Sequence, residues 1–87
     1  MSDPLDDVFP CDFPIKVMGR RDGDLRAAAD AIVARHFGAL PEDKVSARAS
    51  SDGRFVALTY TVRAQSRAQL DALYRELVAC DAVLMAL

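Results

Sequence analysis

The order in which the hydrophobic period changes along the chain most constrains the fold. Apolar residues alternate over 13–18, recur at helical spacing over 25–37, alternate again over 45–50 and 54–63, and return to helical spacing over 70–78. A period of two indicates a half-buried strand, and a spacing of three or four indicates an amphipathic helix. The last segment, DAVLMAL, favours a short strand but also fits a frayed helix end. The predicted order is strand, helix, strand, strand, helix, strand.

Turn and cap signals mark the ends of the first strand and the first helix. Pro14 has no backbone N–H, so we expect it at the first position of the strand, which Gly19 ends. Asp22 or Asp24 is expected to cap the first helix, and Gly38 to stop it.

Similar signals mark the second half of the chain. The Asp52-Gly53 pair between two strand patterns predicts a hairpin turn. Ser66 followed by Gln69 forms a capping box before the second helix, whose middle residue Leu73 should face the sheet.

This order predicts an α+β fold, the ferredoxin-like βαββαβ sandwich or α-β plait, with two helices on one face of a four-stranded antiparallel sheet. Right-handed crossovers give the strand order 4-1-3-2. We expect residues 12–87 to form the domain and residues 1–11 to form a flexible acidic tail.

Composition restricts the class of protein. The formal net charge of -2 and the sequence pI near 5.2 argue against a dedicated nucleic-acid binder. No apolar run is long enough to cross a bilayer, and the acidic start is the reverse of a signal peptide, so a cytoplasmic location is expected.

Cysteine and histidine are too few and too scattered for a metal site. His36 is the only histidine, and no recognisable ligand spacing joins it to Cys11 and Cys80. The predicted topology separates the two cysteines by roughly 20 Å, beyond the Cα separation of about 7 Å that a disulfide allows. We therefore expect free thiols, no metal and no cofactor.

Several segments together resemble one bacterial family. FPIKVMG, a helix ending in RH, SSDGRFVALTYTVRAQS and LDALYRELVACDAVLMAL are similar to the YbeD-like small domain of unknown function, over about residues 9–87. The resemblance implies a ferredoxin-like fold similar to ACT-type regulatory domains, and no established activity. Phe55 and Ala57 stand where the family pattern would have a tyrosine and a serine, which makes hydroxyl chemistry on that strand less credible.

The predicted topology brings a candidate anion site to one edge of the sheet. The expected ligand-binding residues are Gly19, Arg20, Arg21, Gly23 and Arg54, beside the positive end of the first helix. Asp22-Gly23 also resembles the ACT-type pattern before the first helix, although the proline of that pattern is absent. The alternative is that the glycines only make a turn, Asp22 caps the helix and the arginines are solvated.

The sheet face without helices is a candidate partner surface. It should carry Met18, Phe55 and Thr59, and exposed apolar patches often mark contacts between proteins. RNA binding is disfavoured, because Phe55 is the only aromatic residue expected on that face.

Two functional hypotheses follow. The first is a non-enzymatic regulatory or protein-interaction domain, with a protein partner on the sheet face or a homodimer through the edge of the fourth strand. The alternative is a small-metabolite or anion sensor of ACT-like type at the junction of the first strand and first helix. No catalytic residues are predicted, since no paired carboxylates, Ser/His/Asp set or phosphate loop stands out.

Overall fold

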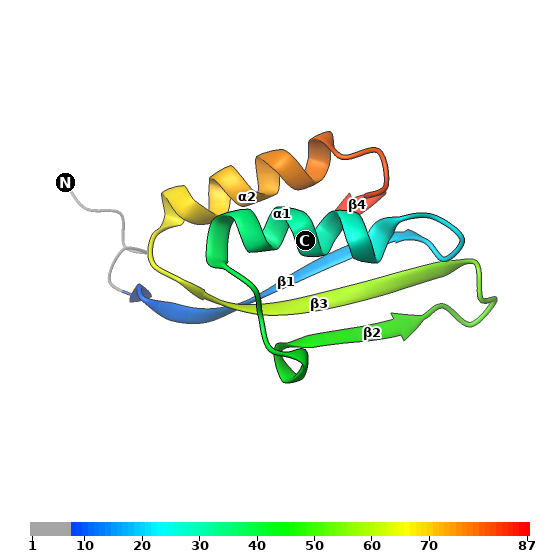
Figure 1. Ribbon diagram of the computed structural model, residues 1–87, viewed down its shortest axis with the longest axis horizontal. Coiled ribbons are helices and arrows are strands. Elements are labelled where there is room, and N and C mark those ends of the chain that lie inside the picture. The colour runs from blue at the N-terminus through cyan, green and yellow to red at the C-terminus, as the bar shows by residue number, and fades with distance from the viewer. Residues whose placement is uncertain (1–7) are drawn as a thin grey trace.

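A computed structural model describes residues 8–87 as one four-stranded sheet with two helices packed on the same face (Figure 1). The elements in chain order are β1 (Cys11–Arg20), α1 (Leu25–Phe37), the short 3-10 helix η2 (Glu42–Lys44), β2 (Val45–Ala49), β3 (Phe55–Ala64), α2 (Arg67–Ala79) and β4 (Met85–Ala86). All strand pairs are antiparallel and the order is β2-β3-β1-β4, which is the predicted order read from the other edge. The predicted ferredoxin-like fold is therefore confirmed.

The central pair β1 and β3 runs in register over ten residue pairs, from Cys11 opposite Ala64 to Arg20 opposite Phe55. β1 begins earlier than the alternation predicts, so Pro14 lies inside the strand and the expectation of a first position is wrong. Lys16 and Leu87 exchange both backbone hydrogen bonds, at 3.1 and 2.7 Å. Backbone N–H groups point to alternate edges along a strand, so the nitrogen of Pro14 points to the same edge of β1 as that of Lys16. The short β4 does not extend as far as Pro14. The missing N–H therefore costs no sheet hydrogen bond.

The core lies between the inner sheet face and the two helices. Tyr60 is the largest buried side chain, and its hydroxyl donates a 2.5 Å hydrogen bond to Asp30, which also accepts from Arg26 Nε at 2.9 Å. Burial and this carboxylate raise the pKa of Tyr60 far above its usual value. The other large side chains that are fully buried are Ile15, Val17, Leu25, Val33, Leu58, Val62, Leu73 and Leu77.

The caps of α2 follow the predicted pattern closely. Ser66 Oγ accepts from the Gln69 backbone N–H at 3.2 Å, which confirms the first half of the capping box. The reciprocal bond shifts by one residue, because Gln69 Oε1 accepts from the N–H of Gln65 at 2.8 Å. The Gln69 amide nitrogen also donates to the His36 carbonyl at 3.0 Å, which ties α2 to the end of α1.

The structure confirms the predicted end of α1 but not the predicted cap at its start. Gly38 has a φ of 78° and its N–H donates to the Ala34 carbonyl, which confirms the predicted stop. Asp24 occupies the N-cap position, but neither its carboxylate nor that of Asp22 makes a capping hydrogen bond within residues 8–87. The backbone of Asp24, at φ -94° and ψ 26°, lacks the extended conformation that aims a side chain at the first amides. The prediction of an aspartate cap is wrong.

The last strand forms, but it is very short. Met85 and Ala86 pair with Met18 and Val17, and Leu84 donates to the Met18 carbonyl at 2.8 Å.

Both cysteines are free thiols and lie near opposite ends of the molecule. Cys11 pairs with Ala64, while Cys80 follows the thirteen residues of α2, which span about 20 Å.

Candidate functional site

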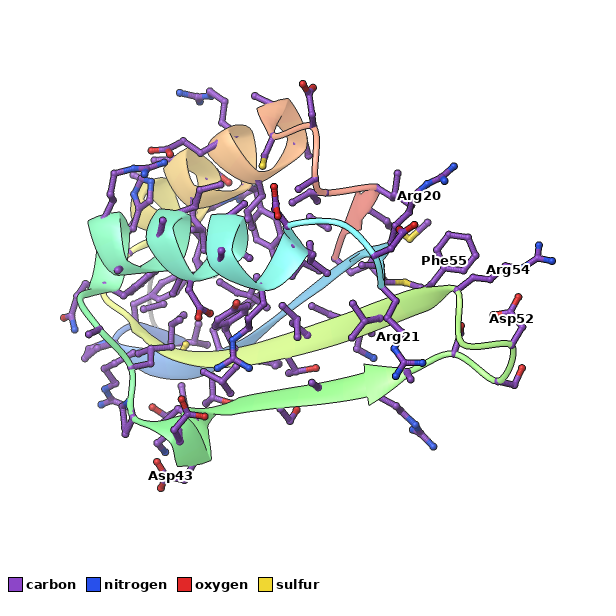
Figure 2. The ribbon with its side chains drawn as sticks, turned by 45° about the vertical axis from the view of Figure 1, so that its right-hand side comes forward. Arg20, Arg21, Asp43, Asp52, Arg54 and Phe55 are labelled. Atoms are coloured by element: carbon purple, nitrogen blue, oxygen red, sulfur yellow. The ribbon has the colours of Figure 1, made fainter. Side chains whose placement is uncertain are left out.

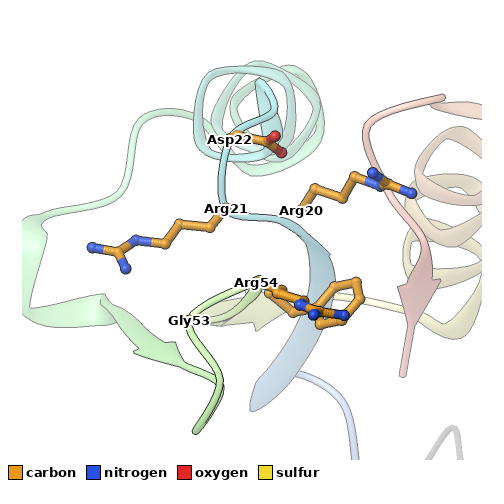
Figure 3. Close-up of a pocket in the computed structure, with 6 residues that line it drawn as sticks. Arg20, Arg21, Asp22, Gly53 and Arg54 are labelled. Carbon is orange, nitrogen blue, oxygen red and sulfur yellow. The ribbon is translucent and has the colours of Figure 1, made fainter.

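The β1–α1 turn and the β2–β3 turn meet at one end of the sheet (Figure 2). The Arg21 N–H donates to the Arg54 carbonyl at 2.9 Å, which holds the two turns together. Between them lies an open hollow of about 560 Å³, lined by Arg20, Arg21, Asp22, Gly53, Arg54 and Phe55 (Figure 3). The structure thus brings together the three arginines that the sequence places at this edge. Cys80 and Asp81, in the turn after α2, do not line the hollow.

The three arginines fan out instead of converging. In Figure 3 the side chains of Arg20 and Arg21 point to opposite sides of the hollow, and Arg54 lies between them. Within residues 8–87 neither Arg20 nor Arg21 has a carboxylate partner, while Arg54 Nε lies 3.8 Å from Asp52 Oδ2. In this arrangement a small anion would meet one guanidinium at a time, whereas a ligand with several separated anionic groups could meet more.

Asp52 fixes the β2–β3 turn and adds negative charge beside the hollow. Its Oδ1 accepts from the Ser50 hydroxyl at 2.7 Å and from the Arg54 N–H at 3.1 Å, and these hydrogen bonds lower the pKa of Asp52. Gly53 follows with a φ of 74°, a left-handed conformation that favours glycine and confirms the predicted turn.

Gly19 and Gly23, predicted as ligand-binding residues, do not line the hollow. Gly19 is buried on the helix side of β1, where an added Cβ would lie 2.5 Å from the Ala82 carbonyl oxygen. Gly23 is exposed in the turn, and its N–H donates to the Arg20 carbonyl at 3.1 Å. Both glycines shape the backbone that carries the arginines.

The sheet face opposite the helices carries the predicted partner residues. The strand register places Met18, Phe55 and Thr59 on this open face, since their neighbours along each strand point into the core. Met18 lies opposite Ala57, Arg20 opposite Phe55, and Lys16 opposite Thr59. From the other side Arg48 of β2 also lies opposite Ala57.

A second hollow lies on this open face around the small side chain of Ala57. It measures about 300 Å³ and is lined by Met18, Arg48, Ala49, Ser50, Ser51, Phe55, Val56 and Ala57. The hollow combines an apolar floor with one guanidinium, which suits an apolar side chain next to an anionic group.

Charge on the open face is opposite in sign to that of the whole chain. Among the described residues, four cations, Lys16, Arg20, Arg48 and Arg63, share the face with one carboxylate, Asp12. Asp12 lies at the far end of the face, 3.5 Å from Arg63. In the part of the chain that the structure describes, the other three cations have no ion-pair partner.

Elsewhere, two side-chain contacts to Glu76 of α2 hold the end of α1. His36 Nε2 lies 2.8 Å from Glu76 Oε1, and Arg35 pairs with the other oxygen of Glu76. The hydrogen bonds from Arg35 and then His36 lower the pKa of Glu76. His36 therefore links α1 to α2 at the core edge. The spacing of Arg26 and Asp30 could have revealed their ion pair. No sequence signal indicated Tyr60 as a partner of Asp30, or Glu76 as a partner of His36.

Two further features are absent from residues 8–87. No group of three or more His, Cys, Asp or Glu side chains is placed to hold a metal ion. No helix in that range combines the length and apolar character needed to cross a membrane.

The fold and this surface define a small α+β sandwich domain with an uncovered, cationic sheet face. The chain belongs to the family described as protein of unknown function (DUF493), whose model matches residues 8–87. A UPF0250 protein of Chromobacterium violaceum is 44% identical over 89 aligned positions that cover 100% of both chains. One from Paraburkholderia phymatum is 44% identical over 79% of this chain and 78% of its own length, and one from Nitrosomonas europaea is 38% identical over 79% of each. These matches confirm the predicted YbeD-like family.

Proposed function

We propose that the protein is a non-enzymatic protein-interaction domain with a regulatory role, and that the open sheet face is its contact surface. The observation that carries the proposal is the composition of that face: half-buried Met18, Phe55 and Ala57 lie together on the two central strands with unpaired cations around them. Such a mixture of apolar centre and polar rim is typical of interfaces between proteins.

The placement of the other reactive side chains supports a non-enzymatic role. His36 is held by Glu76 between the helices, and the hydroxyl of Tyr60 is held by Asp30 against the core. Neither contact opens into the arginine-lined hollow or the hollow at Ala57. Each of these hydrogen bonds joins two elements of the fold, which fits a domain whose role is binding.

A comparative capture experiment tests this function. Tagged wild-type protein and a Met18→Ala, Phe55→Ala double variant are incubated with bacterial lysate, and bound proteins are identified by mass spectrometry. Val78→Ala is the matched control, because Val78 is an apolar residue, 67% exposed, on α2 away from the sheet. A partner should be lost with the face variant and kept with the control, provided that circular dichroism shows both variants folded. Equal capture by all three proteins would overturn the proposal.

A small-metabolite or anion sensor is the second candidate function. Arg20 and Arg21 line the hollow without carboxylate partners in the described chain, and such guanidinium groups form strong hydrogen bonds to anions. An NMR titration with phosphate, carboxylates and amino acids tests this function. Saturable shifts at residues 19–25 and 52–54 that disappear in an Arg20→Ala, Arg21→Ala variant would support a sensor, and diffuse shifts would contradict it.

The edge of β4 is a third place where a partner or a second copy could bind. Because Leu87 exchanges hydrogen bonds with β1, the neighbouring backbone groups of Ala86 face outward. Leu84, Met85 and Leu87 are each more than half exposed beside this edge. A homodimer through β4 should appear in sedimentation and weaken in a Leu84→Asp variant, whereas a monomer at high concentration would contradict it.

A further inference from the structure

We propose that the open face recognises an acidic, extended segment of a partner protein, in which one apolar side chain is flanked by carboxylates. This inference rests on the proposed protein-interaction function and adds the chemistry of the partner.

The hollow around Ala57, referred to as the seat, would hold the apolar side chain of the partner segment. Along β3 the open-face positions are Phe55, Ala57, Thr59, Thr61 and Arg63, so the smallest side chain lies between two larger ones. Met18 flanks Ala57 on the β1 side and Arg48 flanks it on the β2 side. The resulting hollow of about 300 Å³ is large enough for one leucine-sized side chain.

The cations surround this seat at strand spacing. Lys16 lies one open-face position before Met18 on β1 and Arg20 lies one position after it, each about 7 Å along the strand. Arg48 lies on the opposite side of the seat, on the neighbouring strand. An extended segment repeats its side-chain direction at about the same 7 Å interval, so carboxylates two residues before and after an anchored leucine would reach these cations.

Charge and aromatic content favour a protein segment over a nucleic acid. Single-stranded nucleic acids are bound by stacking successive bases on aromatic side chains along a basic groove. Phe55 is the one aromatic ring on this face, and the facing positions of β1 hold Arg20, Met18 and Lys16. The whole chain carries a net charge of -2, which disfavours long-range attraction of a polyphosphate.

The chain contains a segment of this type itself, at Asp3–Asp7, where Leu5 lies between aspartates. The proposed occupant is a segment of a separate partner protein, and binding by a second copy of this chain is a result that the experiment can reveal.

The experiment measures fluorescence anisotropy of labelled peptides with the full-length protein. The probe is a serine-based peptide with a central leucine and a glutamate two residues to each side. One matched peptide replaces both glutamates by glutamine and another replaces the leucine by serine. We expect saturable binding of the probe, binding about tenfold weaker without the leucine, and about threefold weaker for each lost charge.

Protein variants locate the site. Ala57→Leu, which fills the seat, should weaken binding of the probe about tenfold, and Arg48→Gln about threefold. Arg63→Gln is the matched control, because Arg63 lies on the same face but is paired with Asp12 at its far end. It should leave the affinity unchanged. Circular dichroism verifies that Ala57→Leu is folded, and Arg48→Gln tests the same site without altering the packing of the sheet.

Several results would overturn the inference. The glutamine peptide could bind as tightly as the probe, a single-stranded oligouridylate could bind more tightly, or Ala57→Leu could bind normally while folded. Self-association that disappears when residues 1–7 are deleted would show that the occupant is a second copy, which contradicts a separate partner protein.

The results also separate this inference from the proposed function. If none of the peptides binds but capture from lysate still depends on Met18 and Phe55, the partner is not acidic and the interaction function stands. If neither assay depends on the face, both proposals are wrong.

Discussion

Gly19 and Gly23 lie in the same junction between β1 and α1, yet the structure needs only one of them to be glycine. At Gly19 the backbone carbonyl of Ala82 and the side chain of Leu25 approach so closely that an added Cβ would lie 2.5 and 3.0 Å from them. At Gly23 the nearest atom would be 3.5 Å away, and the backbone does not adopt a positive φ. The first glycine therefore allows close packing of β1 against the loop before β4.

Substitution by alanine distinguishes the two glycines. Gly19→Ala should lower the free energy of unfolding by about 1–3 kcal/mol, because backbone must move to relieve the contact with Ala82. Gly23→Ala should leave it within about 1 kcal/mol of wild type, or raise it slightly by restricting the unfolded chain. Urea unfolding measures both changes. Equal destabilisation by the two variants would show that the close approach at Gly19 is not what the position requires.

Leu73 is one of two completely buried residues of α2, the other being Leu77. Its side chain is 0% exposed in the centre of the core, as the helical spacing predicts. Leu73→Ala should cost about 2–5 kcal/mol out of the roughly 5–10 kcal/mol available to so small a domain. Val78→Ala on the same helix should cost little, since Val78 is 67% exposed. A thermal midpoint that falls no further for Leu73→Ala than for Val78→Ala would contradict this packing.

At the scale of elements, Glu76 connects the two helices and makes their contact dependent on pH. Arg35 and His36 at the end of α1 both bond to its carboxylate, and these bonds lower its pKa below the ordinary value of 4.5. A carboxylate whose pKa is lowered by folding contributes stability above its unfolded pKa, and this contribution disappears as the pH falls through the folded pKa.

A Glu76→Gln variant isolates the effect of this carboxylate. The variant should be less stable than wild type at pH 7, and the difference should shrink as the pH falls below 4.5. Urea midpoints of the two proteins at several pH values measure the difference. A gap that stays constant down to about pH 3 would mean that the charge of Glu76 does not contribute.

The positions of the helices could be predicted well from the sequence, whereas the position of Pro14 and the cap of α1 could not. The periodicity fixed helix α1 at Leu25–Phe37, and the Ser66 and Gln69 pair placed the start of α2. The predicted position of Pro14 was wrong because a proline inside a strand is unfavourable only where its missing N–H would have bonded to a neighbouring strand. The nitrogen of Pro14 faces the β4 edge, and β4 is too short to reach it. The aspartate cap failed because the turn at Asp24 has a backbone conformation that residue types alone do not reveal. The sequence also predicted that Arg20, Arg21 and Arg54 lie at one edge. It could not predict that their side chains spread outward, because this depends on the rotamers they adopt in the folded turns.

At the scale of the whole molecule, charge is divided between the two faces of the sheet. The chain as a whole is acidic, with a pI near 5.2, whereas the open face holds four cations and one carboxylate. The helices cover the other face (Figure 1), and several of their cations are engaged by carboxylates, as in Arg26 with Asp30 and Arg35 with Glu76. The unpaired positive charge of the open face should therefore govern how the protein meets an anionic surface or a negatively charged partner.

Ion-exchange chromatography tests this division directly. At pH 7 and low salt the protein should be retarded on a cation exchanger despite its net charge of -2. The reason is that the cations of the open face are close together and can bind the resin locally. Arg48→Gln should elute at lower salt than wild type. Arg75→Gln removes the same formal charge from an exposed position on α2 and should change the elution much less. Because both variants have the same net charge, equal shifts would mean that total charge governs binding, and a larger shift for Arg75→Gln would place the attractive surface on the helices.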